Sequence, residues 1–261
     1  MTFEEKGIFL IDTSGQEKTT CPKCSNGRKK SRDKCLSVNI DDGVWNCHHC
    51  GWNGSLKLFK DLKTSPPKPI VKPEPPKTEL PDNVYQWFED RGITRSIVND
   101  SKIGYENRWI QFPFFKDGEV VNIKSRTADK RFRQSKNAEK CFYRFDFMKG
   151  METIIITEGE MDALSLVQSG YANVVSVPDG ATAPNSKPTD RKFSYLLSAE
   201  EHLMNAEKVI LCTDSDGAGK HLRDELSRRI GREKCCRVNY PSDCKDMNDV
   251  LVKYGEERVV E

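Results

Sequence analysis

The feature that most constrains the fold is an apolar run that leads directly into acidic residues, and it occurs twice. Residues 154–156 are Ile-Ile-Ile and precede Glu158, while residues 209–211 are Val-Ile-Leu and precede Asp214. Such runs, followed by glycine and then a helical pattern, predict β-strands that lead into helices. In alternating α/β units the ligand site lies at the carboxyl ends of the strands. We therefore expect these acidic side chains to lie close together.

A third acidic stretch, residues 243–249, is expected at a third strand end. Hard divalent cations prefer oxygen ligands, and carboxylates that repel one another become favourable neighbours when a cation lies between them. The alternative is that the three motifs are only solvated surface turns. The pattern favours a magnesium site for phosphoryl transfer, with two Mg²⁺ ions, or Mn²⁺ in their place. The expected ligands are Glu158, Asp162, Asp214, Asp216, Asp246 and Asp249.

Two Cys-x-x-Cys pairs lie near the N-terminus and predict one structural Zn²⁺ held by four thiolates. The module of about 60 residues has few large apolar side chains, so it needs the metal to fold. The alternatives are free or buried cysteines, or a redox-active pair. The expected ligands are Cys21, Cys24, Cys47 and Cys50. Three nearby residues are substitute candidates: Cys35, His48 and His49.

Five of the seven residues at positions 28–34, between the two cysteine pairs, are basic, and Trp45 and Trp52 flank the second pair. Basic and aromatic side chains together suit single-stranded nucleic acid, because the charges neutralise phosphates and the rings stack on bases. The alternative is that the charges are only solvated and that both tryptophans fill the core of the module.

Proline marks the domain organisation, because seven prolines lie between residues 62 and 81. We expect an extended, semi-rigid spacer of roughly 50 Å, at about 3.1 Å per residue. The expected parts are a zinc ribbon at 1–62, a Pro-rich linker at 63–81, a basic subdomain at 82–150 and an α/β domain at 151–261.

The basic subdomain begins with helix-like spacing over residues 83–99 and continues with an expected hairpin over 109–124, whose turn is Asp117-Gly118. Lys124 and Arg126, two apart on one strand face, are expected to meet a phosphate backbone. From residue 152 onward, alternating strand and helix patterns predict a parallel sheet covered by helices, one of them running from about Asp216 to Ile230.

The chain contains no apolar run near the ~20 residues that span a bilayer. Its first residues do not resemble a secretory signal. With the cysteines assigned to metal rather than to disulfides, we expect a protein of the reducing cytoplasm. The net charge of +2 says little about partners.

Taken together, Glu158-Gly159 with Asp162, the turn at 214–217 and the stretch at 245–249 resemble the Toprim domain of DnaG-type primases, topoisomerases and some nucleases. A zinc ribbon, a linker, a basic segment and then this domain are similar to bacterial primases, and especially to the primase half of bifunctional phage primase-helicases. The resemblance covers nearly the whole chain, and it implies the cytosol of a bacterium or of a phage-infected host. It implies an α/β Toprim-type parallel-sheet catalytic domain with an α+β basic subdomain and a small zinc ribbon.

The resemblance also implies a function, which is that of a DNA primase making short RNA primers on single-stranded DNA by two-metal nucleotidyl transfer. The implied catalytic residues are Glu158, Asp214, Asp216, Lys124 and Arg126. The implied nucleic-acid or nucleotide contacts are Lys124, Arg126, Arg131 and Lys136.

The expected partners are single-stranded DNA, ribonucleoside triphosphates, a fused or separate replicative helicase and a DNA polymerase, without a membrane. Two other functions stay open: a Toprim-type nuclease, and a non-catalytic single-stranded-DNA-binding module of a replication helicase. Whether the chain is a stand-alone protein or a piece of a longer one also stays open.

Overall fold

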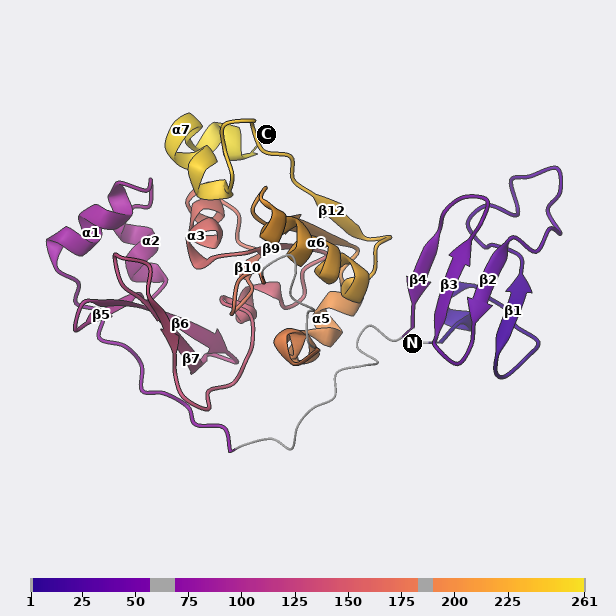
Figure 1. Ribbon diagram of the computed structural model, residues 1–261, viewed down its shortest axis with the longest axis horizontal. Coiled ribbons are helices and arrows are strands. Elements are labelled where there is room, and N and C mark those ends of the chain that lie inside the picture. The colour runs from indigo at the N-terminus through magenta and orange to yellow at the C-terminus, as the bar shows by residue number, and fades with distance from the viewer. Residues whose placement is uncertain (1, 57–68, 183–189, 261) are drawn as a thin grey trace. The chain divides into compact units, whose positions relative to one another are not determined.

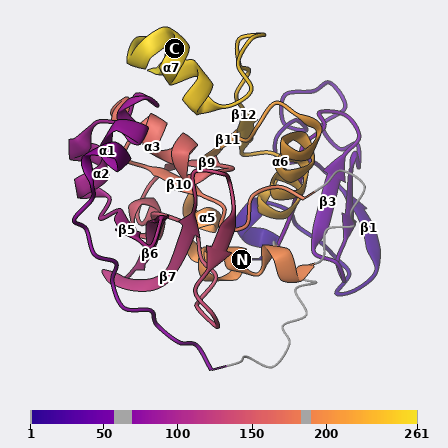
Figure 2. The ribbon, with the colours of Figure 1, turned by 60° about the vertical axis from the view of Figure 1, so that its left-hand side comes forward.

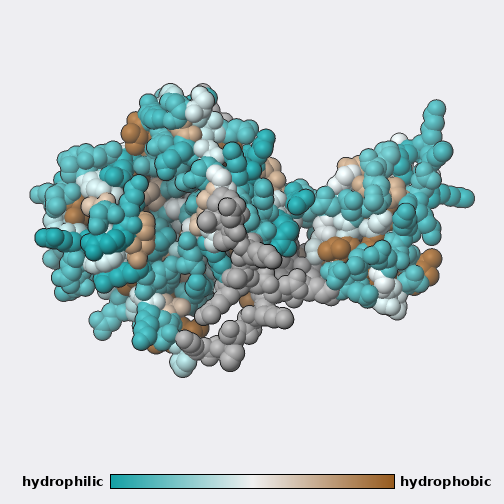
Figure 3. Space-filling view, in the orientation of Figure 1, coloured by the Kyte–Doolittle hydropathy of each residue, from teal (hydrophilic) through white to brown (hydrophobic). Residues whose placement is uncertain are grey.

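The computed structural model describes residues 2–56, 69–182 and 190–260 (Figure 1). The chain divides into two compact units, residues 1–60 with 227–235 and residues 61–226 with 236–261. Within the described residues, no helix is long and apolar enough to cross a membrane. The face of the second unit seen in Figure 3 is mainly hydrophilic, with small hydrophobic spots.

The first unit is built on a four-stranded antiparallel sheet in the order β1-β2-β3-β4. Its small core includes Ile8, Leu36 and Trp45. The ring of Trp52 packs on Trp45, with 5.3 Å between centroids, so both tryptophans contribute to packing, as the alternative interpretation of these residues expected. The elements are η1 (Glu4–Lys6), β1 (Gln16–Thr19), β2 (Leu36–Asn39), β3 (Val44–Cys47) and β4 (Asn53–Ser55).

The first helices of the second unit are two short ones, and they lie where residues 83–99 have helix-like spacing. These are α1 (Asp82–Glu89) and α2 (Arg95–Asp100). Gly92 lies between them with φ of 73°, a left-handed conformation that glycine adopts at little cost. The change of direction at this glycine lets Phe88 and Val98 both enter the core.

A second antiparallel sheet follows, in the order β5-β6-β7-β8. The predicted hairpin is confirmed as β6 (Trp109–Lys116) and β7 (Glu119–Arg126). Its turn residues Asp117 and Gly118 have φ of 55° and 77°, which is the positive pair that a tight two-residue hairpin needs. The outer strands are β5 (Gly104–Glu106) and β8 (Phe132–Gln134).

Part of the Pro-rich segment is bound to this sheet. The amide of Val71 donates to the carbonyl of Asn137 at 3.0 Å, and the amide of Tyr105 donates to the carbonyl of Lys77 at 3.2 Å. The spacer length expected for residues 63–81 therefore does not apply to residues 71–77, because backbone hydrogen bonds hold them against the second unit. Residues 63–68 and the expected boundary at residue 62 lie outside the described residues.

The third sheet has the order β10-β9-β11-β12. Its central strand β9 (Thr153–Thr157) pairs in parallel with both β10 (Val174–Ser176) and β11 (Lys208–Cys212). In both ribbon views β9 and β10 lie between α3 (Glu160–Gln168) and α6 (Gly217–Ile230) (Figures 1 and 2). The predicted fold class, a parallel sheet covered by helices, is confirmed.

The third acidic stretch does not lie directly at a strand end, which corrects one expectation. Strand β12 (Cys235–Arg237) ends before residue 238, and the acids lie in the loop that leads into α7 (Met247–Val260). Pro241 lies in this loop and offers no amide for a ladder, which is consistent with the end of pairing. Gly255 kinks α7, with φ of 78°. The remaining elements are η2 (Phe145–Met148), η3 (Asp190–Phe193), α4 (Tyr195–Ser198) and α5 (Glu200–Asn205).

Gly219 allows the first turn of α6 to approach the loop that carries Asp214. A Cβ atom at this position would lie 2.2 Å from the carbonyl oxygen of Asp214. We expect Gly219→Ala to lower the free energy of unfolding by about 1–3 kcal/mol, because the backbone must shift to relieve the overlap. Gly27→Ala is the matched control, since nothing lies within 4 Å of its Cβ position. Equal urea midpoints for the two variants, followed by circular dichroism, would contradict this prediction.

Candidate active site

A cleft of about 1420 Å³ lies within the second unit, between the parallel sheet and the β6–β7 hairpin side. One part of its lining is acidic and comes from the ends of β9 and β11, from α3 and from the start of α7. The acidic residues predicted as metal ligands that line it are Glu158, Asp162, Asp214, Asp246 and Asp249. Another part is basic and includes Arg91, Lys124 and Arg126.

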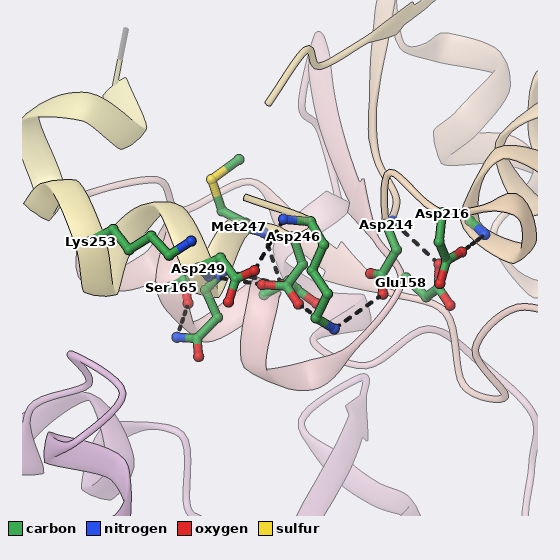
Figure 4. A network of polar contacts seen from close by, with 12 residues as sticks. Glu158, Ser165, Asp214, Asp216, Asp246, Met247, Asp249 and Lys253 are labelled. Carbon is green, nitrogen blue, oxygen red and sulfur yellow. Dashed lines mark hydrogen bonds and ion pairs between the residues drawn. The ribbon is translucent and has the colours of Figure 1, made fainter. Parts of the chain in front are cut away.

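Glu158 and Asp214 follow the adjacent strands β9 and β11 and lie side by side (Figure 4). The amide of Asp214 donates to Glu158 Oε2 at 3.4 Å, and the amide of Ala181 donates to Glu158 Oε1 at 3.2 Å. Burial raises the pKa of Glu158. Burial, and then the charge of Glu158, raise the pKa of Asp214 to about 7. The pair therefore carries a repulsion that a bound cation would relieve.

Asp162 is buried and holds the start of α7. Its Oδ1 accepts the amides of Met247 and Asn248, at 3.1 and 3.2 Å. Burial raises its pKa well above the usual range, and the charges of Asp246 and Asp214 add to this effect. One oxygen of Asp162 is thus used to position α7, and its predicted role as a magnesium ligand stays a prediction.

Asp246 and Asp249 also use oxygens to cap α7, beside Asp162. The amide of Asp249 donates to Asp246 Oδ1 at 2.8 Å, and the amide of Lys245 donates to Asp249 Oδ2 at 3.0 Å. This arrangement is similar to a capping box, in which side chains three apart satisfy the free amides of a helix start. Figure 4 shows Asp246 beside Asp249 near the start of α7.

Lys245 supplies the counter-charge within this acidic group. Its Nζ lies 2.9 Å from Asp246 Oδ2 and 3.8 Å from Asp214 Oδ2. The hydrogen bond to Asp246 raises the pKa of Lys245. A cation therefore already lies between carboxylates of two different loops, which indicates that the donor set suits positive charge. Across the described part of the chain, only cysteines bring three or more ligand atoms within 4.8 Å of one another, so the carboxylates are more widely spaced.

Asp216 lies outside the lining of the cleft. It is exposed, and its Oδ1 accepts the amide of Gly219 at 2.8 Å, capping α6. In Figure 4 it lies next to Asp214 and Glu158. The sequence placed it correctly beside Asp214, but its predicted catalytic and metal-binding role stays a prediction.

Lys124 contributes a buried charge to the basic part of the lining. Its Nζ lies 2.8 Å from Glu160 Oε1, and the two side chains are only 10% and 7% exposed. Removing one partner of such a pair leaves the other charge uncompensated, which is strongly destabilising. Lys124 therefore lies inside the cleft and joins β7 to α3, and its predicted contact with a phosphate stays a prediction.

Arg126 and Arg91 both stack on the ring of Trp87, with guanidinium carbons 4.9 and 3.9 Å from its centroid. Burial lowers the pKa of Arg126, and the neighbouring charge of Arg91 lowers it further. Arg126 Nε is buried without a hydrogen-bond partner among the described residues. Two guanidinium groups held near each other and facing the cleft form a site suited to an anion, because guanidinium binds phosphate oxygens through paired donors.

Two other predicted contacts, Arg131 and Lys136, do not line the cleft. Both are exposed, and Arg131 Nε pairs with Asp129 Oδ2 at 3.0 Å. Arg133 and Lys140 line the cleft in their place. The sequence could not separate these basic residues, because all four belong to one charged segment and only the path of the chain around β8 decides which side chains face inward.

Sequence reasoning missed Arg91 and Asn248. Asn248 Nδ2 donates to the carbonyl of Arg91 at 2.8 Å and to Ser165 Oγ at 2.9 Å, so it joins α7 to α3 and to the turn that carries Arg91. No sequence signal marked Arg91, which lies in the turn that follows α1.

The four predicted zinc ligands lie together in the first unit. Their sulfur atoms are all within 4.8 Å of one another, and the Sγ–Sγ distances are 3.8 Å for Cys21–Cys50 and for Cys24–Cys47. A Zn²⁺ with Zn–S bonds of about 2.3 Å needs sulfurs about 3.8 Å apart. This cluster therefore fits a zinc site. His48 Nε2 instead contacts Ser37 Oγ at 2.9 Å.

Comparison with known proteins finds a family match for the part of the chain that carries Glu158 and Asp214. Residues 152–239 match the Toprim domain. The chain is 32% identical over 260 residues to the Primase homolog protein of Arabidopsis thaliana, covering 90% of this chain and 77% of that protein. This chain belongs to the Toprim-domain primase family.

Two further comparisons match this chain to part of a longer relative and to a primase fragment of known structure. It is 33% identical over 264 residues to the Twinkle homolog protein, chloroplastic/mitochondrial, of Arabidopsis thaliana, covering 90% of the chain but only 36% of that relative. The crystal structure of the primase fragment of the bacteriophage T7 primase-helicase has the same fold, with a TM-score of 0.57 at 20% identity, and covers 93% of this chain and 97% of the fragment.

The raised pKa of Asp214 predicts a pH dependence of the metal-free protein. The pKa of an aspartate in the unfolded chain is ~4, whereas that of Asp214 in the folded protein is about 7. Between these two pH values the folded state binds the proton more tightly than the unfolded state does. The contribution of Asp214 to stability therefore falls as the pH rises. We expect the free energy of unfolding of Asp214→Asn, relative to the wild type, to rise across this window and to level off above it. The measurement is urea unfolding from pH 4 to 8 in the presence of a chelator, which keeps the protein free of metal.

Asp129→Asn is the control of opposite sign for this pH series, because a hydrogen bond from Thr127 lowers the pKa of Asp129. Asp129 contributes stability above its unfolded pKa, so this variant should lose stability relative to the wild type at neutral pH and not at low pH. A constant difference between Asp214→Asn and the wild type from pH 4 to 8 would contradict the raised pKa.

Proposed function

We propose that this chain is a DNA primase that joins ribonucleotides on a single-stranded DNA template. The observation that carries this proposal is one cleft with two opposite linings, carboxylates at the end of a parallel sheet and cationic side chains across from them. A polynucleotide backbone and a triphosphate are both polyanions, so the basic lining suits binding and the acidic lining suits metal-assisted transfer.

Magnesium is the proposed ion of the acidic lining. Glu158, Asp214 and Asp246 are the proposed ligands, because their oxygens face the cleft and carboxylate is the donor that this ion prefers. When bound, Mg²⁺ would neutralise the triphosphate and activate the attacking hydroxyl. Glu158, whose pKa is raised by burial, is also suited to accept a proton from that hydroxyl.

Lys245 is expected to compete with the metal, because its ammonium lies between Asp246 and Asp214. Lys245→Ala should bind Mg²⁺ more tightly in isothermal titration and should be less stable without metal, since the carboxylates lose their counter-charge. Lys253→Ala is the matched control: Lys253 pairs with Asp243 at 3.5 Å and does not line the cleft. Weaker Mg²⁺ binding by Lys245→Ala would show that Lys245 helps to build the site.

The basic lining is proposed to bind template and nucleotide. Arg126 and Arg91 have their guanidinium groups beside the cleft and are the best placed phosphate donors, while Lys124 orients α3 through Glu160. The first unit is proposed to carry one structural Zn²⁺ and to contact single-stranded DNA through the exposed lysines of residues 29–34.

A replicative helicase and a DNA polymerase are the proposed partners. The support is the similarity to a phage primase-helicase fragment and to a Twinkle homolog of which this chain spans about a third.

One incubation tests the activity: the full chain with single-stranded DNA, labelled ribonucleoside triphosphates and Mg²⁺. Oligoribonucleotides are the expected product. Shortened DNA would instead indicate the nuclease alternative. The absence of both products would indicate a non-catalytic binding module. Glu158→Gln and Asp214→Ala should each reduce synthesis by about 100-fold or more, because they remove a proton acceptor or a metal ligand.

The matched control for these acids is Asp224→Asn, an exposed acid on α6 that does not line the cleft. It should synthesise primers at the wild-type rate. Template binding by Glu158→Gln and Asp214→Ala should be kept, which separates loss of chemistry from loss of fold. Synthesis near the wild-type rate by both variants would show that the active site lies elsewhere.

A further inference from the structure

A fifth sulfur, that of Cys35, touches the cysteine cluster of the first unit. Its Sγ lies 3.6 Å from Cys47 Sγ and 4.0 Å from Cys24 Sγ. Cys24 and Cys47 are themselves 3.8 Å apart. The three sulfurs therefore form a triangle with sides close to the ~3.8 Å that separates two thiolates on one tetrahedral zinc.

This triangle shares its Cys24–Cys47 side with the four-cysteine cluster. Zinc in a structural site takes four ligands, so Cys35 cannot be bound together with the other four thiolates. Cys35 lies beside two of the four sulfurs, those of Cys24 and Cys47, and is not part of the group whose sulfurs are all within 4.8 Å of one another. A second set of four thiolates would consist of these three and one of the two remaining cysteines. Of these two, Cys21 is buried and Cys50 is exposed, so Cys50 is the ligand more open to exchange with solvent.

The fold holds Cys35 in this position by contacts of its backbone and of its sulfur. The amide of His48, next to Cys47, donates to the Cys35 carbonyl at 2.9 Å. Leu36, the next residue, pairs directly with Cys47 across the β2–β3 ladder. Arg28 Nη2 donates to the Cys35 sulfur at 3.2 Å and places a positive charge beside it. That charge suits a thiolate cluster, since four thiolates around one Zn²⁺ carry two excess negative charges.

We propose that Cys35 is a reserve zinc ligand, which completes a tetrathiolate site with Cys21, Cys24 and Cys47 when Cys50 is absent or displaced. The inference rests on the zinc site of the proposed function and extends it to a residue outside the two Cys-x-x-Cys pairs. A zinc ribbon with a fifth ligand keeps its metal when one thiolate is lost, and the first unit depends on that metal because its core is small.

The test is zinc affinity of the full, reduced chain, measured by competition with a chromophoric chelator, for wild type and for variants at Cys35 and Cys50. We expect Cys35→Ser to bind zinc as the wild type does. Cys50→Ser should bind within about 10-fold of it, and Cys50→Ser combined with Cys35→Ser about 100-fold more weakly than Cys50→Ser alone, since each ligand carries a share of the binding energy. Cys50→Ser combined with Cys236→Ser is the matched control, because Cys236 is an exposed thiol of the second unit.

Substitution by Co²⁺ gives a second readout. The absorption spectrum of cobalt reports the number of thiolates, which should be four in Cys50→Ser and three in the Cys35/Cys50 double variant. The proposal would be overturned if Cys50→Ser lost zinc to the same extent as the double variant. It would also be overturned if the cobalt spectra showed three thiolates in both variants. Absence of zinc from the wild type would instead overturn the zinc site itself, which keeps the two conclusions separate.

Discussion

The amides at the start of α7 organise the acidic edge of the second unit. Asp162 accepts two of them, and Asp246 accepts a third. A helix start has unpaired amides and a partial positive charge, so it stabilises carboxylates that would otherwise repel one another. By binding side chains from α3 and from its own first turn, α7 brings the loop of residues 243–249 to the strand ends where Glu158 and Asp214 lie.

The opposite lining depends on a different interaction, the buried pair of Lys124 and Glu160. This pair ties the antiparallel sheet to the first residue of α3, and α3 in turn carries Asp162. The positions of the acidic and basic linings are thereby linked. Stacking of Arg91 and Arg126 on one tryptophan keeps two like charges close, a costly arrangement unless it serves an anionic ligand. The cleft is thus charged in a way that suits a metal on one side and phosphates on the other.

The first unit is stabilised differently, because it has too little apolar surface for a core that would hold the fold by itself. Ile8, Leu36, Val38 and Trp45 make up most of its buried side chains apart from the cysteines. Under such conditions the metal supplies much of the folding energy. A fifth sulfur beside the cluster, that of Cys35, would then help to keep the metal on which the fold depends. In a unit with a large core the same sulfur would matter less for stability.

The sequence by itself determined the elements whose signals are local. The Asp117-Gly118 turn, the β9 and β11 strands with acids after them, the helix from residue 217 to Ile230 and the two cysteine pairs depend on a few adjacent residues, and each lies where it was expected. Only the tertiary structure decided which charges face the cleft. Arg91 and Asn248 gave no local signal, Asp216 and Lys136 gave a signal but face elsewhere, and Asp162 proved to cap a helix 85 residues away. Periodicity reports whether a side chain lies on an element's inner or outer face, whereas a site is formed by contacts between elements far apart in the chain, which no local pattern encodes.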